Sequence, residues 1–417
     1  MNCHFREIKE NEIMDFLHIR NHVYPAFAGT PQDTEKSAER YRKFFAKDVV
    51  TPIGAFSETE KLLGIMILFD FTINFRGKAI RTGGIGGVGV DLVYKKRHIC
   101  RDMIAFGLRF FMDRGIYSSV LHPFRVDFYK KMGFGLLTPF YKYRLPTERI
   151  ERNNLSKQVT FLNEDDIQDI AECYQEHFKR TNGEIKRIPE WPKAMLNNHT
   201  NIVVGYRENG KLMAYAICTP LKLSEENFLR HDLKVHEFIT LNTAGRKAIL
   251  GFLRTQADQF ENIRFYTQDD TFYQQFDNPS DESKGLFPHA NHAMAYASTG
   301  LMFRILETKG FIDQLSEDQN NHDNGIVCLF EISEPFLRDQ KQSIKLKITE
   351  SGIYSSEEDE DLTIKLSMAD FSSMLFGAIP IKKLVNYGLA ECSDDKLMQK
   401  VSDLLSKCEK PAYHAEF

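Results

Sequence analysis

The sequence predicts an α+β protein in which two similar α/β units precede a third module of strands and helices. Three observations support this class. A chain of 417 residues exceeds what one hydrophobic core usually supports. Two stretches of the chain share one order of elements, and the remainder has a different pattern. We therefore expect two or three domains.

The order of predicted elements repeats. Residues 5–24 and 160–178 each suit a short strand, an acidic helix start and an amphipathic helix. Residues 54–67 and 205–217 each suit a two-stranded hairpin, the second with an Asn-Gly turn. We interpret this as a duplication. The alternative is that unrelated α/β segments look alike at this coarse level.

The third region begins after a polar loop at 278–291. Predicted domains are therefore 1–147, 148–291 and 292–417, and the polar segment 146–157 separates the first two. The last domain is expected to contain three strands followed by three helices, at 325–332, 343–348, 362–366, 368–376, 382–387 and 395–408.

The most informative stretch joins a glycine-rich strand, 85–93, to the basic run Lys95, Lys96 and Arg97. Apolar residues then recur at helical spacing from near His98, and Gly115 suits a left-handed C-cap. A helix start offers free N–H groups and a positive dipole end, so cations beside it predict a phosphate site. A solvated basic corner is the simpler alternative.

Residues 117–134 continue with a strand, a Pro-containing loop, a short helix and a Gly-Phe exit. The whole order resembles the acetyl-CoA fold of the GNAT acyltransferases. Their loop is Arg/Gln-x-x-Gly-x-Gly/Ala, and here His98 and Cys100 occupy the two small positions. The second copy has fewer cations after residue 241 and lacks the Tyr-x-x-x-Gly-Phe ending. We therefore expect the first copy to bind the cofactor and the second to be degenerate.

The third region looks like a sterol-carrier-protein-type domain, and the full layout resembles the Eis-type (enhanced intracellular survival) N-acetyltransferases. The resemblance implies that the terminal carboxylate of Phe417 acts as general base and Tyr129 as general acid. It also implies an acetyl-CoA site with a loop that closes over it, and a hexameric assembly. Glu416 would attract a cationic substrate. The acetyl-CoA and loop residues are Val88, Gly89, Val90, Lys96, Arg97, His98, Ile99, Cys100, Arg101, Phe124 and Arg125.

These residue types suit amine acetylation. An alkyl ammonium has a pKa of about 10.4 and must lose a proton before it attacks a thioester. A partly buried carboxylate can hold and deprotonate it, and a phenol of pKa about 10 can protonate the departing thiolate. Local sequence alone also allows Tyr129 to be a packing residue against Phe134, and Phe417 to be a frayed end.

The expected function is direct acetyl transfer from acetyl-CoA to an amine, either an aminoglycoside-like molecule or a protein lysine. The alternatives are an acyltransferase for longer acyl-CoAs and a non-catalytic scaffold that binds CoA or lipid. Comparing acetyl-CoA with long-chain acyl-CoAs as donors distinguishes the first alternative, and failure of CoA to raise the melting temperature would favour the second.

Composition excludes other classes. A net charge of −4 gives no support for nucleic-acid binding. The longest apolar stretch, 62–69, is too short for a bilayer, and the N-terminus lacks a signal-peptide pattern, which predicts a cytoplasmic protein. Seven scattered cysteines without a Cys-x-x-Cys pair predict reduced thiols and no metal site.

Overall fold

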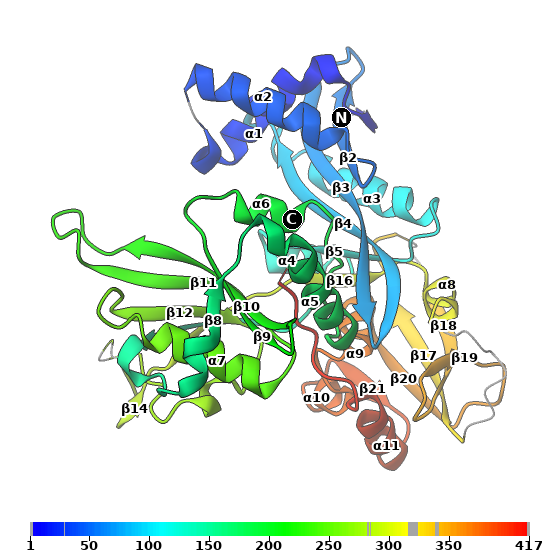
Figure 1. Ribbon diagram of the computed structural model, residues 1–417. Helices are drawn as coiled ribbons and strands as arrows, with labels where there is room; N and C mark the ends of the chain where they lie inside the picture. Colours follow the sequence, from blue (N-terminus) through cyan, green and yellow to red (C-terminus); the bar gives the residue numbers. More distant parts are fainter. Residues whose placement is uncertain are drawn as a thin grey trace.

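The computed structural model describes residues 3–28, 30–281, 283, 285–315, 324–337 and 342–414. Three sheets organise these residues (Figure 1). The first carries the blue and cyan elements, the second the green ones, and the third the yellow and orange ones near the lower right of the view. This arrangement confirms the predicted α+β class.

The first sheet has seven strands in the order β1-β2-β3-β4-β5-β16-β6. Only β4 and β5 pair in parallel; the other neighbours are antiparallel. The strands are β1 (Cys3–Glu7), β2 (Val50–Ser57), β3 (Leu62–Phe75), β4 (Lys78–Val90), β5 (Ser118–Leu121), β16 (Met302–Ile305) and β6 (Gly135–Leu136).

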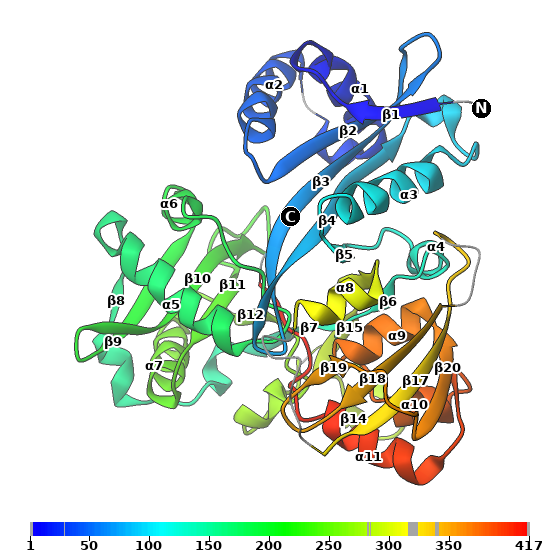
Figure 2. The same cartoon turned by 90° about the vertical axis from the view of Figure 1, so that its right-hand side faces the viewer.

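Helices cover both faces of the first sheet because β3 alternates its buried side chains between them. Ile65 and Ile67 pack in a core with α1 (Ile13–Val23) and α2 (Pro31–Phe45). Met66 and Leu68 pack in another with α3 (Ile99–Met112), on the opposite side in Figure 2. The short helix α4 (Val126–Lys130) follows β5.

The predicted helix after the basic run is confirmed as α3. Gly115 follows its end with φ +69°, the left-handed conformation that the sequence suggested for this glycine. The structure also explains the glycine of the Gly-Phe exit. Gly133 has φ +79°, and a Cβ there would lie 2.4 Å from the guanidinium of the buried Arg304.

The second sheet has the order β15-β7-β12-β11-β10-β9-β8. Its Asn-Gly hairpin is confirmed: Asn209 and Gly210 join β9 to β10 with φ of +51° and +79°. The strands and helices are β15 (Ala295–Ser298), β7 (Phe140–Pro146), β12 (Asn262–Thr267), β11 (His231–Thr240), β10 (Lys211–Lys222), β9 (Ile202–Glu208), β8 (Val159–Phe161), α5 (Ile167–Arg180), α6 (Trp191–Leu196) and α7 (Thr243–Arg254).

Strands cross between the units. After β6, the chain leaves the first sheet and β7 pairs with β12 in the second. After the second unit, β16 returns to the first sheet and lies between β5 and β6. Each of the two sheets therefore contains a strand from outside its own unit. The predicted domain boundaries at 147 and 291 do not coincide with divisions between the sheets, and they stay predictions.

The third module contains the predicted three strands and three helices, plus edge strands. A small hairpin precedes it. The hairpin is β13 (Leu286–Phe287) and β14 (Asn291–His292), and the module comprises α8 (Thr308–Asp313), β17 (Ile326–Ser333), β18 (Gln342–Ile348), β19 (Ile353–Ser355), β20 (Leu362–Ser367), α9 (Met368–Leu375), α10 (Ile381–Asn386), β21 (Ala390–Cys392) and α11 (Asp395–Leu405). One core joins it to the first sheet: Phe303 of β16 packs on Phe75 and Phe376.

All seven cysteines lie in the described part of the chain and are unpaired, as expected for reduced thiols. Within that part, each helix is too short or too polar to cross a bilayer.

Candidate active site

A splay between two parallel strands creates the site. β4 and β5 pair only from Gly83 with Ser119 to Ile85 with Leu121. β5 then ends while β4 continues, and a bulge at Gly87, with φ +57°, turns the continuing backbone. No described strand pairs with this edge of β4 beyond Ile85, so its backbone groups are available to an extended ligand.

The predicted residues Val88, Gly89 and Val90 lie on this continuing edge of β4. The phenol of Tyr24, from the end of α1, donates a 2.8 Å hydrogen bond to the Val88 carbonyl. The edge is therefore held from the α1 side of the sheet.

The basic loop ends at the start of α3, as predicted. Lys95, Lys96, Arg97 and His98 are exposed there. The N–H groups of the first residues of α3, Ile99 to Arg101, have no intrahelical acceptor, as in any helix. The N-cap side chain does not bond to them either. Free N–H groups, the helix dipole and nearby cations together suit a pyrophosphate.

His98 occupies the position where related loops carry glycine, and its backbone shows why glycine is favoured. It has φ +64° and ψ 1°, which is left-handed and unfavourable for a residue with a Cβ. The loop thus adopts a left-handed conformation at His98 without a glycine and holds backbone strain at that point.

We expect His98→Gly to raise the free energy of unfolding by about 1 kcal/mol, because it relieves this strain at an exposed position. Chemical denaturation of both proteins measures the change. The matched variant is His98→Ala, which keeps a Cβ and should give no such gain. Equal stabilisation by alanine would show that the imidazole, rather than the backbone, is unfavourable.

Tyr129 lies on α4 and is 6% exposed. Its ring meets Phe134 edge-on at 6.1 Å, so it does pack in the core as the alternative interpretation expected. Its hydroxyl nevertheless has no hydrogen-bond partner among the described residues. Burial raises the pKa of Tyr129 well above that of a free phenol, and nearby Cys100 and Tyr24 add to the rise. The phenol therefore stays protonated at neutral pH.

Tyr24 bonds to Val88 on the open edge. Burial raises the pKa of both Tyr24 and Tyr129, and Cys100, in the first turn of α3, adds to the rise in both. The strand edge, the helix start and the phenol therefore lie near one another. Phe124, 87% exposed, and Arg125, bonded to Asp127 at 2.5 Å, lie in the loop after β5.

Glu416 and Phe417 lie outside the described residues. The segment before them approaches the end of β5. The Tyr413 ring lies 6.0 Å from that of His122, which directly follows β5, and its hydroxyl accepts a 2.8 Å hydrogen bond from the Leu301 N–H. The Tyr413 N–H donates to the Gln268 side chain at 2.7 Å.

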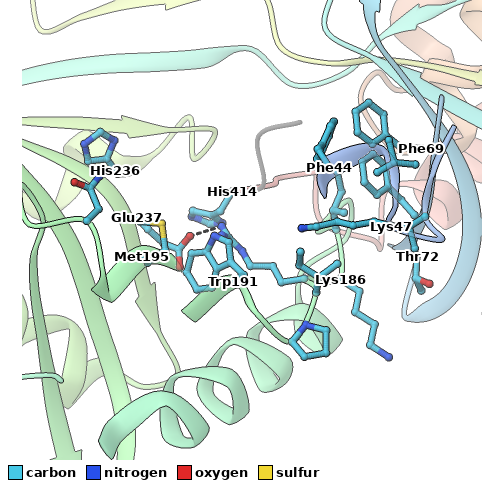
Figure 3. Close-up of a pocket in the computed structure, with 18 of the residues that line it drawn as sticks. Phe44, Lys47, Phe69, Thr72, Lys186, Trp191, Met195, His236, Glu237 and His414 are labelled. Carbon is cyan, nitrogen blue, oxygen red and sulfur yellow. Dashed lines mark hydrogen bonds and ion pairs between the residues drawn. The ribbon is translucent and has the colours of Figure 1, made fainter. Parts of the chain in front are cut away.

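A cleft of about 730 Å³ lies between the first and second units, and Figure 3 shows its lining. Phe44 and Phe69 come from the first unit and Trp191 from the second, with His414 of the C-terminal segment also on the wall. The wall also carries five charged residues: Lys47, Asp70, Lys186, Arg187 and Glu237.

Both acids of this wall are already paired. Asp70 accepts a 2.5 Å hydrogen bond from Arg81. Glu237 is 4% exposed and bonds to Arg187 and to the phenol of Tyr215. The described wall thus combines aromatic and aliphatic side chains with polar ones, and both of its acids are paired with arginines.

Among the described residues, His177, Glu184 and His414 place donor atoms within 4.8 Å of one another, the spacing of potential metal ligands. The Glu184 carboxylate, however, already accepts five hydrogen bonds from protein donors. Hydrogen bonding accounts for this cluster without a cation.

Sequence reasoning did not identify Tyr24, Glu184 or Gln268. Tyr24 ends a predicted helix with no special signal. Glu184 follows a Thr-Asn-Gly run that resembles an ordinary polar loop. Their roles depend on contacts with residues 64 to 230 positions away, which local patterns do not encode.

Two family models describing an acetyltransferase (GNAT) domain match the chain, one over residues 4–137 and another over 178–305. The chain therefore belongs to the GNAT acetyltransferases and carries two tandem domains of that family. The second match ends at β16, the strand that returns to the first sheet. No curated protein matches the sequence.

Solved structures share the full architecture. A GCN5-related N-acetyltransferase from Anabaena variabilis is 15% identical, with a TM-score of 0.80 and both chains wholly covered. A probable N-acyltransferase from Enterococcus faecalis is 16% identical, with a TM-score of 0.78 and both chains wholly covered. Eis1 from Mycobacterium abscessus is 16% identical, with a TM-score of 0.75, and both chains are again wholly covered. This confirms that the chain has the fold of the Eis-type proteins.

Proposed function

We propose that this GNAT protein is an acetyl-CoA-dependent N-acetyltransferase whose first domain performs direct transfer to an amine. The observation that carries the proposal is the joining of an open β4 edge, an uncapped α3 start and the protonated phenol of Tyr129. These three features suit the pantetheine, the pyrophosphate and the thioester sulfur of one extended ligand.

The residues of the first domain have distinct proposed roles. Backbone groups of Val88 to Val90 hold the pantetheine and polarise the thioester carbonyl. The N–H groups of Ile99 to Arg101, with Lys96 and Arg97, hold the pyrophosphate. Phe124 and Arg125 flank the bound CoA.

The transfer proceeds in one complex. The Phe417 carboxylate takes a proton from the ammonium, and the amine nitrogen then attacks the thioester carbon. The carbon–sulfur bond breaks, and Tyr129 donates its proton to the thiolate. The second proton that the nitrogen loses restores the Tyr129 phenol, and the Phe417 carboxyl releases the first proton to solvent. The described chain supports the placement of Phe417, because three residues after His414 span up to about 10 Å and His414 lines the cleft.

We propose the second domain as a structural copy. Its α7 begins at an N-cap, Asn242, whose side chain accepts a 2.8 Å hydrogen bond from the Gly245 N–H. The helix start is thus occupied by the protein itself, in contrast to α3. A sterol-carrier-like third domain, a hexameric assembly and a cytoplasmic location remain predictions from the resemblance and the sequence.

The acceptor enters the cleft of about 730 Å³. The resemblance implies a polycationic amine or an exposed lysine, attracted by Glu416. The aromatic and aliphatic side chains of the lining, with Asp70 and Glu237 already paired to arginines, favour a second class: an amine on an apolar or aromatic body.

Release of free CoA thiol tests the proposal. The purified protein is assayed with acetyl-, octanoyl- and myristoyl-CoA against an aminoglycoside, a lysine peptide and phenylethylamine. We expect amine-dependent thiol release that is fastest with acetyl-CoA. Faster release with the longer chains would indicate the other acyltransferase class. No amine-dependent release, and no rise in melting temperature with CoA, would favour the scaffold.

A further inference from the structure

One short segment, 181–186, joins the first sheet to the end of the chain. Its backbone continues the hydrogen bonding of β3. The Gly183 N–H donates to the Asn74 carbonyl at 2.7 Å, the Asn74 N–H donates to the Glu184 carbonyl at 2.8 Å, and the Lys186 N–H donates to Thr72 at 2.8 Å. The segment is therefore fixed relative to the strands that carry the candidate active site.

The same segment holds the C-terminal residues. The Asn182 carbonyl accepts a 2.8 Å hydrogen bond from the Ala412 N–H, and the Asn182 side chain donates to the Glu409 carbonyl at 2.9 Å. Gly183 allows the close approach, because a Cβ there would lie 2.8 Å from Pro411. The chain end thus runs along 182–184 rather than over open surface.

Glu184 is the centre of this contact. Its side chain is fully buried and accepts two hydrogen bonds from His414: the backbone N–H at 3.0 Å and the ring Nδ1 at 2.8 Å. Two neighbours on α5 complete the shell, with the Tyr174 phenol at 2.6 Å and His177 Nε2 at 3.2 Å. The Ile185 N–H adds a fifth bond at 3.1 Å.

Charge reinforces this geometry. Burial by itself raises the pKa of Glu184, but His414 and His177 outweigh it and hold that pKa well below its usual range. Burial lowers the pKa of His414, and Glu184 outweighs it and raises that pKa. A buried carboxylate with an imidazolium partner is a directional contact, and it binds both the backbone and the ring of one residue.

We infer that Glu184 is a positioning residue: by fixing His414 at two points, it directs the last three residues of the chain toward the acetyl-transfer site. This inference rests on the proposed function of Phe417. Glu184 itself contacts neither substrate, and its effect is transmitted through His414. A misplacement of about 1 Å at reacting groups can cost 100-fold in rate, so this control is substantial.

The test compares Glu184→Gln with the wild-type full chain. Glutamine keeps the side-chain shape and removes the charge and one acceptor site. We expect kcat to fall 10- to 100-fold while KM for acetyl-CoA changes less than twofold. The matched control is Tyr174→Phe, which removes another donor from the same carboxylate and leaves both hydrogen bonds of His414 in place, and it should retain kcat within about threefold.

Release of Phe417 by carboxypeptidase A gives a readout that does not depend on catalysis. We expect at least tenfold faster release from Glu184→Gln than from wild type or Tyr174→Phe. This result keeps its meaning even if the protein proves not to be an acetyltransferase. His414→Ala gives the second route: it should match Glu184→Gln, and the double variant should be no worse than either.

Two results would overturn the inference. One is unchanged Phe417 release from both Glu184→Gln and His414→Ala. The other is an equal loss of kcat in Tyr174→Phe, which would show that the cluster stabilises the fold without directing the chain end.

Discussion

Adding one glycine after Phe417 should reduce kcat at least 100-fold. The extra residue moves the terminal carboxylate by about 3.5 Å, beyond the reach of the ammonium that it is proposed to deprotonate. The site on β4 and α3 does not involve the chain end, so CoA should still bind. Steady-state kinetics measures the first effect, and the rise in melting temperature with CoA measures the second.

The matched control adds the same glycine before Met1, where it should leave kcat unchanged. An enzyme extended after Phe417 that retains a normal kcat would exclude the carboxylate as general base. A loss of the CoA-induced stabilisation would instead indicate that the C-terminal segment supports the cofactor site.

Tyr129→Phe should lower kcat about 100-fold, the lower end of the range for a general acid, with little change in the KM for acetyl-CoA. The ring packs against Phe134, and phenylalanine keeps that contact, so the fold should be retained. Because burial holds the pKa of Tyr129 above its usual value, wild-type activity should not fall through phenol ionisation below about pH 10.

Tyr94→Phe is the control for Tyr129→Phe. Tyr94 lies in the loop after β4, and its hydroxyl accepts a 3.2 Å hydrogen bond from Lys61 rather than facing the thioester. Its kcat should stay near that of wild type. An unchanged rate in Tyr129→Phe itself would return Tyr129 to a packing role alone.

Elements with a local signal were predictable from the sequence. The Asn209-Gly210 turn has the positive φ values that two-residue hairpins need, and Gly115 closes α3 as its position suggested. The helical spacing after His98 and the strands of the third module were equally readable. In each case the residues that carry the pattern also form the element.

Features that depend on distant pairing were not predictable. The strand 302–305 was assigned to the third region, yet it lies between β5 and β6 of the first sheet. A strand of four residues, three of them apolar, carries no information about which sheet it joins. Glu184 was missed for the same reason, since its partner His414 lies 230 positions later.

The candidate site likewise has features that the sequence predicted and features that it did not. The pattern of glycines and cations was sufficient to predict a strand at Val88 to Val90 and a helix start after the basic run. That these two elements bind one ligand stays a proposal. The pattern could not show that Tyr24 bonds to Val88 and lies near Tyr129, nor that His98 adopts a left-handed conformation. The role of Phe417 came only from the family resemblance and stays a proposal.

A crystal structure of the full chain with CoA and an accepted amine is the most direct measurement of the central claim. The account predicts a Phe417 carboxylate oxygen within about 3 Å of the amine nitrogen, and the Tyr129 hydroxyl within hydrogen-bonding distance of the CoA sulfur. A Phe417 carboxylate on the outer surface, or a sulfur bound far from Tyr129, would contradict it.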